Sequence, residues 1–299
     1  MDGNNVRSIG KRAIEAVART LPRQQTVLGQ AAKYAADCSS VARYEDLFLR
    51  NGRGSKYDES VRASILKRFR RIDKEMDIKT TPTDGLFLAE ALLSIDCPGA
   101  VVECGCFNGG STAKLSIVAA ITGHKLFVFD SFEGLPEADS YNTFDLHARR
   151  SVAWTQRNHW RVGQYAAPVD AVKANIDRYG DASVCIFIKG WFNETLGAGL
   201  PQQVALAFTD VDLPSSAQEC LMQIWPRLSE GGIFFSHDIA YLKVLQAFND
   251  ERLWRETFNE HPPIFFGAGF GMCDSSPHLG FAVKGGVTPD YIKSLTYDK

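Results

Sequence analysis

The sequence has no excess of charge of either sign. Its 33 lysines and arginines nearly balance its 35 aspartates and glutamates, which gives a formal net charge of -2 at pH 7. Proteins that bind nucleic acids usually concentrate positive charge on one surface, whereas the basic residues here are scattered along the chain. We therefore expect no nucleic-acid partner.

Long apolar runs and paired cysteines are also missing. No stretch is long enough to cross a membrane, and residues 1–21 mix charged residues into a helical pattern that does not suit a secretion signal. The seven cysteines are an odd number without C-x-x-C spacing, so they predict neither a disulfide framework nor a zinc site. We expect reduced thiols in a cytoplasmic protein that makes no membrane contact.

What the chain does contain is enough apolar material for a substantial core. It has 299 residues, of which 45% are hydrophobic. Residues 1–80 are charge-rich, with apolar positions three or four residues apart, and this spacing predicts an N-terminal helical extension. Residues 81–299 are expected to form the main domain, and a long insert is expected at about 137–168.

From Ala100 onward, short apolar runs alternate with helical periods. This alternation predicts a Rossmann-like α/β fold, in which a mostly parallel sheet has helices on both faces. Two further candidate strands are joined by a glycine-rich connection that suits a final antiparallel hairpin. The five runs lie at 101–104, 126–129, 184–188, 204–208 and 233–235, and the candidate hairpin strands at 263–266 and 279–283.

The strongest motif is V-V-E-C-G-C-F-N-G-G-S-T at residues 101–112. An apolar strand leads through Glu103 into a glycine-rich turn and a helix start, so that a ligand can lie against bare backbone. A nicotinamide-binding turn would read G-x-G-x-x-G, but Phe107 occupies the place of its second glycine. The spacing suits a ligand without a pyrophosphate, and Glu103 places negative charge for a cationic amino-acid portion. The alternative is a purely structural strand-to-helix turn.

Asp130 is the second candidate binding residue. It ends the run 126–129, about 25 residues after Gly105. In Rossmann-like sheets an acidic residue at this place accepts hydrogen bonds from both ribose hydroxyls. The alternative is a solvated loop aspartate that caps the turn before Ser131.

With both elements in view, residues from about 80 to 250 resemble the macrocin and mycinamicin type of sugar O-methyltransferase, and more loosely the catechol O-methyltransferases. The resemblance implies a class I methyltransferase with a seven-stranded sheet, S-adenosylmethionine as donor, and methyl transfer to a hydroxyl of a small-molecule acceptor. It often includes a divalent cation such as Mg²⁺. The residues that carry it are 103–112, F-D-S-F-E-G-L-P at 129–136, K-G-W-F at 189–192, D-V-D-L at 210–213, and His237 with Asp238.

The resemblance assigns cofactor contacts by position. The glycine turn would approach the methionine portion, Asp130 would hold the ribose, and Gly190 with Trp191 would border the adenine, although Trp191 can equally be a plain core residue. The segment 80–83 corresponds to one that closes over the cofactor. The complete set of predicted cofactor contacts is Glu103, Gly105, Gly109, Gly110, Ser111, Asp130, Ser131, Gly190, Trp191 and Asp210.

The resemblance also assigns Asp210, His237 and Asp238 to the metal and to catalysis. His237 departs from the family pattern, which usually has a carboxylate there, and Mg²⁺ prefers oxygen ligands. Three interpretations stay open. Asp210 and Asp238 hold a cation, with Asp212 or water completing the shell; or no metal is needed and His237 is the general base; or these residues are structural.

The insert is expected to supply the acceptor pocket, because long loops over a rigid sheet often form binding walls. Its aromatic residues would suit a sugar face, an aromatic ring or a polyketide, or would simply pack the insert against the sheet or a second subunit. We also expect a homo-oligomer, because the N-terminal helices present apolar faces. The alternatives are transfer to nitrogen or carbon, a nicotinamide-dependent oxidoreductase, and a catalytically silent relative. The insert aromatics are Tyr141, Phe144, Trp154, Trp160 and Tyr165.

Overall fold

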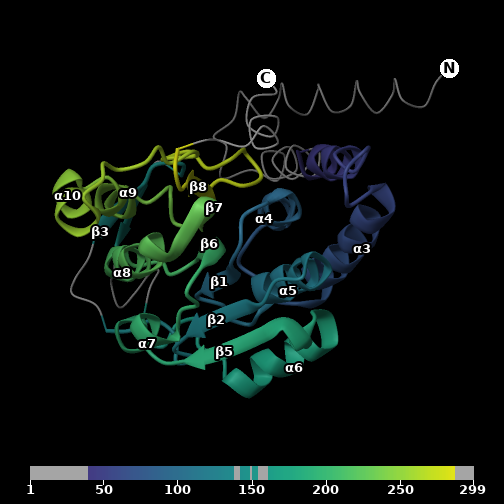
Figure 1. The fold of residues 1–299 in the computed structure, drawn as a ribbon. Coiled ribbons are helices and arrows are strands. Elements are labelled where there is room, and N and C mark those ends of the chain that lie inside the picture. Colours follow the sequence, from purple (N-terminus) through teal and green to yellow (C-terminus); the bar gives the residue numbers. More distant parts are fainter. Residues whose placement is uncertain (1–39, 138–141, 149, 154–160, 287–299) are drawn as a thin grey trace, which may run out of the picture.

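A computed structural model describes residues 40–137, 142–148, 150–153 and 161–286 of the chain. Residues 40–50 form a helix, and the remaining elements alternate in the order expected of an α/β fold (Figure 1). The helices are α3 (Glu59–Glu75), α4 (Pro82–Ser94), α5 (Gly110–Thr122), α6 (Val169–Tyr179), α7 (Phe192–Gly199), α8 (Pro214–Ile224), α9 (Leu242–Phe248) and α10 (Glu251–Phe258). The strands are β1 (Ala100–Cys104), β2 (Leu126–Asp130), β3 (Asn142–Asp145), β4 (Arg150–Ala153), β5 (Cys185–Lys189), β6 (Val204–Thr209), β7 (Leu228–Ser236) and β8 (Gly280–Val283).

The main sheet has the strand order β5-β2-β1-β6-β7-β8. All neighbours are parallel except β7 and β8, which are antiparallel. The five predicted apolar runs are all strands of this sheet, so the predicted Rossmann-like fold is confirmed. From β1 the strand order proceeds through β2 to β5 on one side, and β6, β7 and β8 then follow on the other side of β1. The boundary between β1 and β6 is therefore a topological switch point, and such a point opens a crevice at the carboxyl ends of the strands.

The number of strands differs from the seven that the resemblance implied. In the described residues the main sheet has six strands, because the predicted strand at 263–266 is not formed. Only Phe266 makes a bridge, to Phe281 of β8. Pro262 and Pro263 lack the backbone N–H that a ladder needs, so the segment cannot pair over its full length. The predicted hairpin between 263–266 and 279–283 is thus reduced to this one bridge, and the last strand, β8, pairs along its length with β7 instead.

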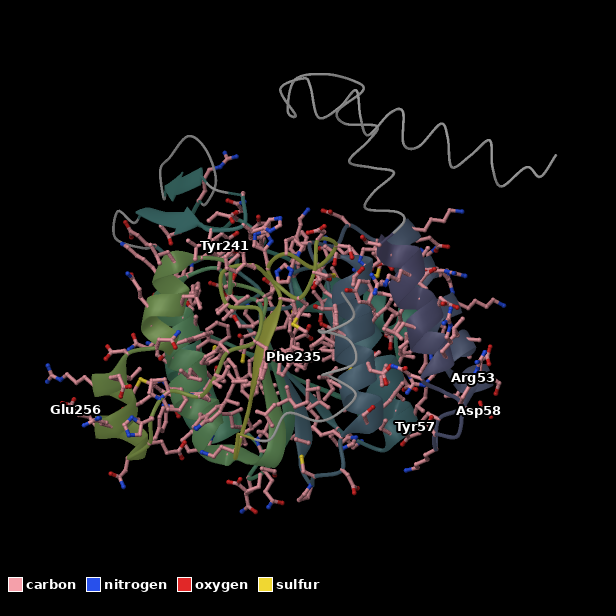
Figure 2. The ribbon with its side chains drawn as sticks, turned by 90° about the horizontal axis from the view of Figure 1, so that it is seen from above. Arg53, Tyr57, Asp58, Phe235, Tyr241 and Glu256 are labelled. Carbon is pink, nitrogen blue, oxygen red and sulfur yellow. The ribbon has the colours of Figure 1, made fainter. Side chains whose placement is uncertain are left out.

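Alternate side chains along the strands supply two cores, one on each face of the sheet. Val101 points into a core with α3, α4, α5 and α6, and Val102 into a core with α7, α8, α9 and α10. The two groups of helices lie on opposite sides of the sheet in Figure 1. Figure 2 shows Phe235 of β7 in the middle of the molecule, where it is 2% exposed. Within the described ranges, no helix is long and apolar enough to cross a membrane.

A buried ion pair joins α3 to α4. The guanidinium of Arg62 donates to both carboxylate oxygens of Glu90, at 2.6 and 3.0 Å, and also to the carbonyl oxygen of Phe48, at 3.0 Å. The side chains of Arg62 and Glu90 are 2% and 3% exposed. Because two parallel hydrogen bonds fix the geometry, this pair holds α3 and the helix at residues 40–50 against α4.

We predict that Glu90→Ala destabilises the protein by about 3–5 kcal/mol, because it leaves the Arg62 guanidinium buried and unpaired. The measurement is the free energy of unfolding from denaturant titration. Replacing both partners, as Arg62→Met with Glu90→Leu, should recover much of the loss. The matched control is Glu256→Ala, which breaks the exposed Arg252–Glu256 pair and should cost little. If Glu90→Ala and Glu256→Ala lowered the free energy of unfolding equally, the buried Arg62–Glu90 pair would not have the stabilising role assigned to it.

Candidate active site

A cavity of about 660 Å³ opens where the parallel strands end. Its walls come from the residues that follow five neighbouring strands, together with the segment 78–80 that precedes α4. This volume lies in the usual range for small-molecule sites. Most of the predicted site residues line this one cavity, namely Gly105, Gly110, Ser111, Asp130, Ser131, Gly190, Trp191, Asp210, His237 and Asp238.

The glycine-rich turn between β1 and α5 is shaped by close backbone packing. Gly105 has φ +83°, and a Cβ there would collide with the carbonyl oxygen of Asp210. Gly109 is the left-handed N-cap of α5 and offers no side chain to cap the helix. Gly110 and Ser111, at the start of α5, line the cavity. Because the first N–H groups of a helix lack intrahelical partners, the start of α5 can donate hydrogen bonds to a ligand carboxylate.

Glu103 lies beneath this turn, and it is not among the residues that line the cavity. It is 0% exposed, and neither carboxyl oxygen has a hydrogen-bond partner among the described residues. Burial raises the pKa of Glu103 to about 8, and the nearby hydroxyls of Ser111 and Thr112 offset this only in part. The predicted contact of Glu103 with a cofactor is therefore not visible in the cavity wall and stays a prediction.

Asp130 holds the two loops that flank it. One carboxylate oxygen accepts the backbone N–H of Cys106 at 2.7 Å, and the other accepts that of Phe132 at 2.6 Å. A carboxylate has about four acceptor positions, so Asp130 can still accept hydrogen bonds from a ligand in the cavity. Trp191 borders the same cavity and is only partly buried, which argues against its being a plain core residue.

His237, directly after β7, is held between two carboxylates. Its Nδ1 lies 3.3 Å from Asp210, and its Nε2 lies 3.2 Å from Asp84. Burial opposes the charged imidazolium, but Asp210 and Asp84 outweigh it and raise the pKa of His237 well above its usual value. The two carboxylates therefore favour the imidazolium form of His237, and in that form both ring nitrogens donate to carboxylates and no nitrogen is left to accept a proton.

Asp84 is a further site residue, which its sequence context did not identify. It is 0% exposed at the start of α4, where it forms a capping box with Thr81, and the hydroxyl of Ser276 donates to it. Burial opposes its ionisation, but His237, Ser276 and the Thr81 backbone hold its pKa below the usual value. The T-x-x-D spacing was the only signal available in the sequence, and it indicated a helix start rather than a partner for His237.

The residues assigned to a metal do not fit a hard divalent cation. His237 already places positive charge between Asp210 and Asp84. Asp238 is 1% exposed, uses Oδ2 to accept the N–H groups of Val211 and Asp212, and has a pKa raised to about 6, chiefly by burial. In the part of the chain that the structure describes, no three His, Cys, Asp or Glu side chains converge as a ligand set. Mg²⁺ would need several free oxygen ligands here.

A second histidine borders the cavity beside His237. The rings of His278 and His237 are 5.9 Å apart, and Nε2 of His278 lies 3.4 Å from Asp145 of β3. Sequence reasoning missed both His278 and Asp145. Because β8 runs antiparallel to β7, the residues just before β8 lie beside those just after β7. A prediction that these two strands pair would have placed His278 beside His237.

The insert contributes the β3–β4 hairpin and one aromatic residue of the cavity wall. Tyr165 lines the cavity and makes an edge contact with Phe107, with ring centroids 5.5 Å apart. The side chain of Phe144 is outside the description, and so are three other predicted aromatic residues: Tyr141, Trp154 and Trp160. Figure 2 shows Tyr241 at the end of the molecule where this hairpin lies, and its backbone bridges to Asp145.

Comparison with protein families gives one match, to the model for macrocin-O-methyltransferase (TylF), over residues 87–262. This match spans more than half of the chain. Among curated proteins, a tetracenomycin rhamnosyl 4'-O-methyltransferase of Streptomyces olivaceus is 35% identical over 171 residues, which are 56% of this chain and 62% of that protein. A demethyldecarbamoylnovobiocin O-methyltransferase of Streptomyces niveus is 29% identical over 50% of this chain and 56% of that protein. The aligned segment thus spans about three-fifths of these relatives.

Two solved structures share the fold. The O-methyltransferase NovP superposes with a TM-score of 0.52 over 82% of this chain and 99% of NovP, at 17% identity. The calicheamicin methyltransferase CalS11 gives a TM-score of 0.50 over 78% of this chain and 96% of CalS11, at 18% identity. At such low identity the likeness is one of fold alone.

We predict that His237 keeps its proton through neutral pH and that Asp84→Asn lowers its pKa. A histidine whose folded pKa is raised stabilises the protein fully below its unfolded pKa of about 6.5, and this contribution is lost as the pH rises through the folded pKa. The measurement is an NMR titration of the His237 ring, with Glu256→Gln as a distant exposed control. A titration midpoint at the ordinary histidine pKa, or one that Asp84→Asn leaves unchanged, would be inconsistent with a His237 held between Asp84 and Asp210.

Proposed function

Because the chain belongs to the macrocin-O-methyltransferase (TylF) family, we propose that it transfers a methyl group from S-adenosylmethionine to a sugar hydroxyl of a glycosylated small molecule. The observation that carries this proposal is a single cavity bordered by the open α5 start, the Asp130 carboxylate and Trp191. These groups suit, in that order, the carboxylate, the ribose hydroxyls and the base of the donor. When bound, the donor supplies a sulfonium methyl group that is already a good electrophile.

The chain's own residues then have to align and enclose the reactants. Residues 78–80 line the cavity next to the start of α5, where Ile78 packs against Gly110, and Tyr165 lines it from the insert. Holding the acceptor oxygen at near-attack distance from the methyl group can supply a large part of the acceleration. Oxygen is the proposed acceptor atom because both curated relatives are named as O-methyltransferases. A sugar is proposed because the first of them is named for a rhamnosyl substrate.

The proposed reaction needs no divalent cation. The side chain of His237 places positive charge beside Asp210, and Oδ2 of Asp238 accepts two backbone N–H groups; Asp212 also lines the cavity. We also propose that the protein is cytoplasmic and forms a homo-oligomer. The six described cysteines form no disulfide, which is consistent with a reducing compartment.

Calorimetry with S-adenosylhomocysteine tests the donor site. We predict that the protein binds it and that NADH does not bind. Gly105→Ala should weaken binding at least about tenfold, because the new Cβ pushes the turn away from Asp210 and misplaces the ligand's hydrogen bonds. Gly123→Ala is the matched control, since Gly123 has φ +82° but an open space at its Cβ position. Absence of binding to the unaltered protein would refute the proposal.

Chelation tests the role of metal. We predict that turnover on a panel of L-rhamnosides, measured as S-adenosylhomocysteine formation, is unchanged by excess chelator. We further predict that His237→Asp creates an oxygen-rich site, so that Mg²⁺ raises the Tm of this variant but not that of the unaltered protein. Loss of turnover in chelator, restored by Mg²⁺, would refute the metal-free reaction.

A further inference from the structure

Methyl transfer to a sugar hydroxyl, on which this inference rests, leaves one requirement unmet. The hydroxyl proton has to leave as the new bond forms, and a general base with a pKa near neutrality serves this best. His237 is unsuited, because Asp84 and Asp210 occupy both of its ring nitrogens. Asp238 is unsuited as well, because it is 1% exposed and accepts two backbone N–H groups.

His278 stands at the same end of the cavity. Its side chain is 25% exposed and lines the cavity, so a ligand can reach the ring. Its position is fixed by the backbone, since its carbonyl oxygen accepts the N–H of Ile239 at 3.1 Å. This bond ties the segment before β8 to the segment after β7, and places the His278 ring 5.9 Å from that of His237.

Asp145 orients the His278 ring. Its carboxylate is 3% exposed and lies 3.4 Å from Nε2 of His278. The other carboxylate oxygen accepts the N–H of Ala148 at 2.8 Å, and the Asp145 backbone bridges to Tyr241, so the carboxylate cannot swing freely. A carboxylate at one ring nitrogen selects the tautomer with the proton on that nitrogen, which leaves Nδ1 of His278 as the acceptor.

We propose that His278, oriented by Asp145, is the general base that deprotonates the acceptor hydroxyl. The acceptor oxygen forms a bond to the methyl carbon, and the bond from that carbon to sulfur breaks with its electron pair left on sulfur. The hydroxyl proton moves to Nδ1 of His278. The positive charge of the sulfonium is thus replaced by an imidazolium, which the Asp145 carboxylate stabilises.

The other titratable groups near His278 are poorer candidates. The Tyr241 ring is 5.5 Å away, but burial and the surrounding carboxylates raise its pKa far above neutrality, so it stays a neutral phenol. His147 is 6.2 Å away, exposed, and not part of the cavity wall. Asp145 itself is nearly inaccessible. The insert, through β3, therefore contributes an orienting carboxylate to the catalytic end of the cavity.

The first test compares His278→Asn with His261→Asn, an exposed histidine outside the cavity. We expect kcat on the L-rhamnoside panel to fall about 100-fold or more in His278→Asn, with the affinity for S-adenosylhomocysteine unchanged. His261→Asn should keep kcat within about twofold, as removal of a group outside the reaction does. A kcat for His278→Asn within about threefold of the unaltered protein would overturn the proposal.

The second test needs no acceptor. In histidine-selective ¹⁵N spectra, neutral His278 should carry its proton on Nε2, and Asp145→Asn should shift the population toward the other tautomer. Asp145→Asn should also lower kcat while leaving KM nearly unchanged, which a purely structural role would not do. A proton on Nδ1 in the unaltered protein, or a tautomer that ignores Asp145→Asn, would overturn the proposal.

The two tests also separate this inference from the function on which it rests. If the unaltered protein binds no S-adenosylhomocysteine, the proposed function fails, whatever the tautomer of His278. If it binds S-adenosylhomocysteine and transfers methyl groups while His278→Asn remains fully active, only the assignment of the base fails.

Discussion

The active-site end of the molecule depends on the ionic clamp in which Asp84 and Asp210 hold His237. The clamp joins three segments that are far apart in the chain, the start of α4, the end of β6 and the end of β7. It also favours a protonated His237, because the two carboxylates raise its pKa despite the burial of the ring. The resemblance to sugar O-methyltransferases implies a metal ion in this region, and the imidazolium form favoured at His237 would supply positive charge there instead.

Because His237 is held in this clamp, it cannot be the general base of the proposed reaction. A histidine that stays protonated cannot remove a proton from an acceptor, so the base has to come from another residue. The antiparallel strand β8 brings His278 to the neighbouring position, and the insert brings Asp145 against it. In the proposed reaction, the motifs of the parallel strands would bind the donor, and the insert and the last strand would supply the groups that face the acceptor.

The two halves were predictable from the sequence to different degrees. The glycine turn and Asp130 lie within one strand–helix–strand unit, so local spacing was enough to identify them and the fold. The pairing of His237 with Asp84 spans 153 residues, and that of His278 with Asp145 spans 133. No local pattern encodes such pairs, because only the strand order and register bring their members together. The predicted strand at 263–266 failed for a local reason. Pro262 and Pro263 prevent a ladder that the overall topology would have allowed.

The most direct measurement is a crystal structure of the protein soaked with S-adenosylhomocysteine. The account predicts that the amino-acid portion lies at the start of α5, that the ribose hydroxyls contact Asp130, and that the sulfur faces the end of the cavity that holds His237 and His278. An empty crevice in the soaked crystals, or a nucleoside bound away from Asp130, would contradict it.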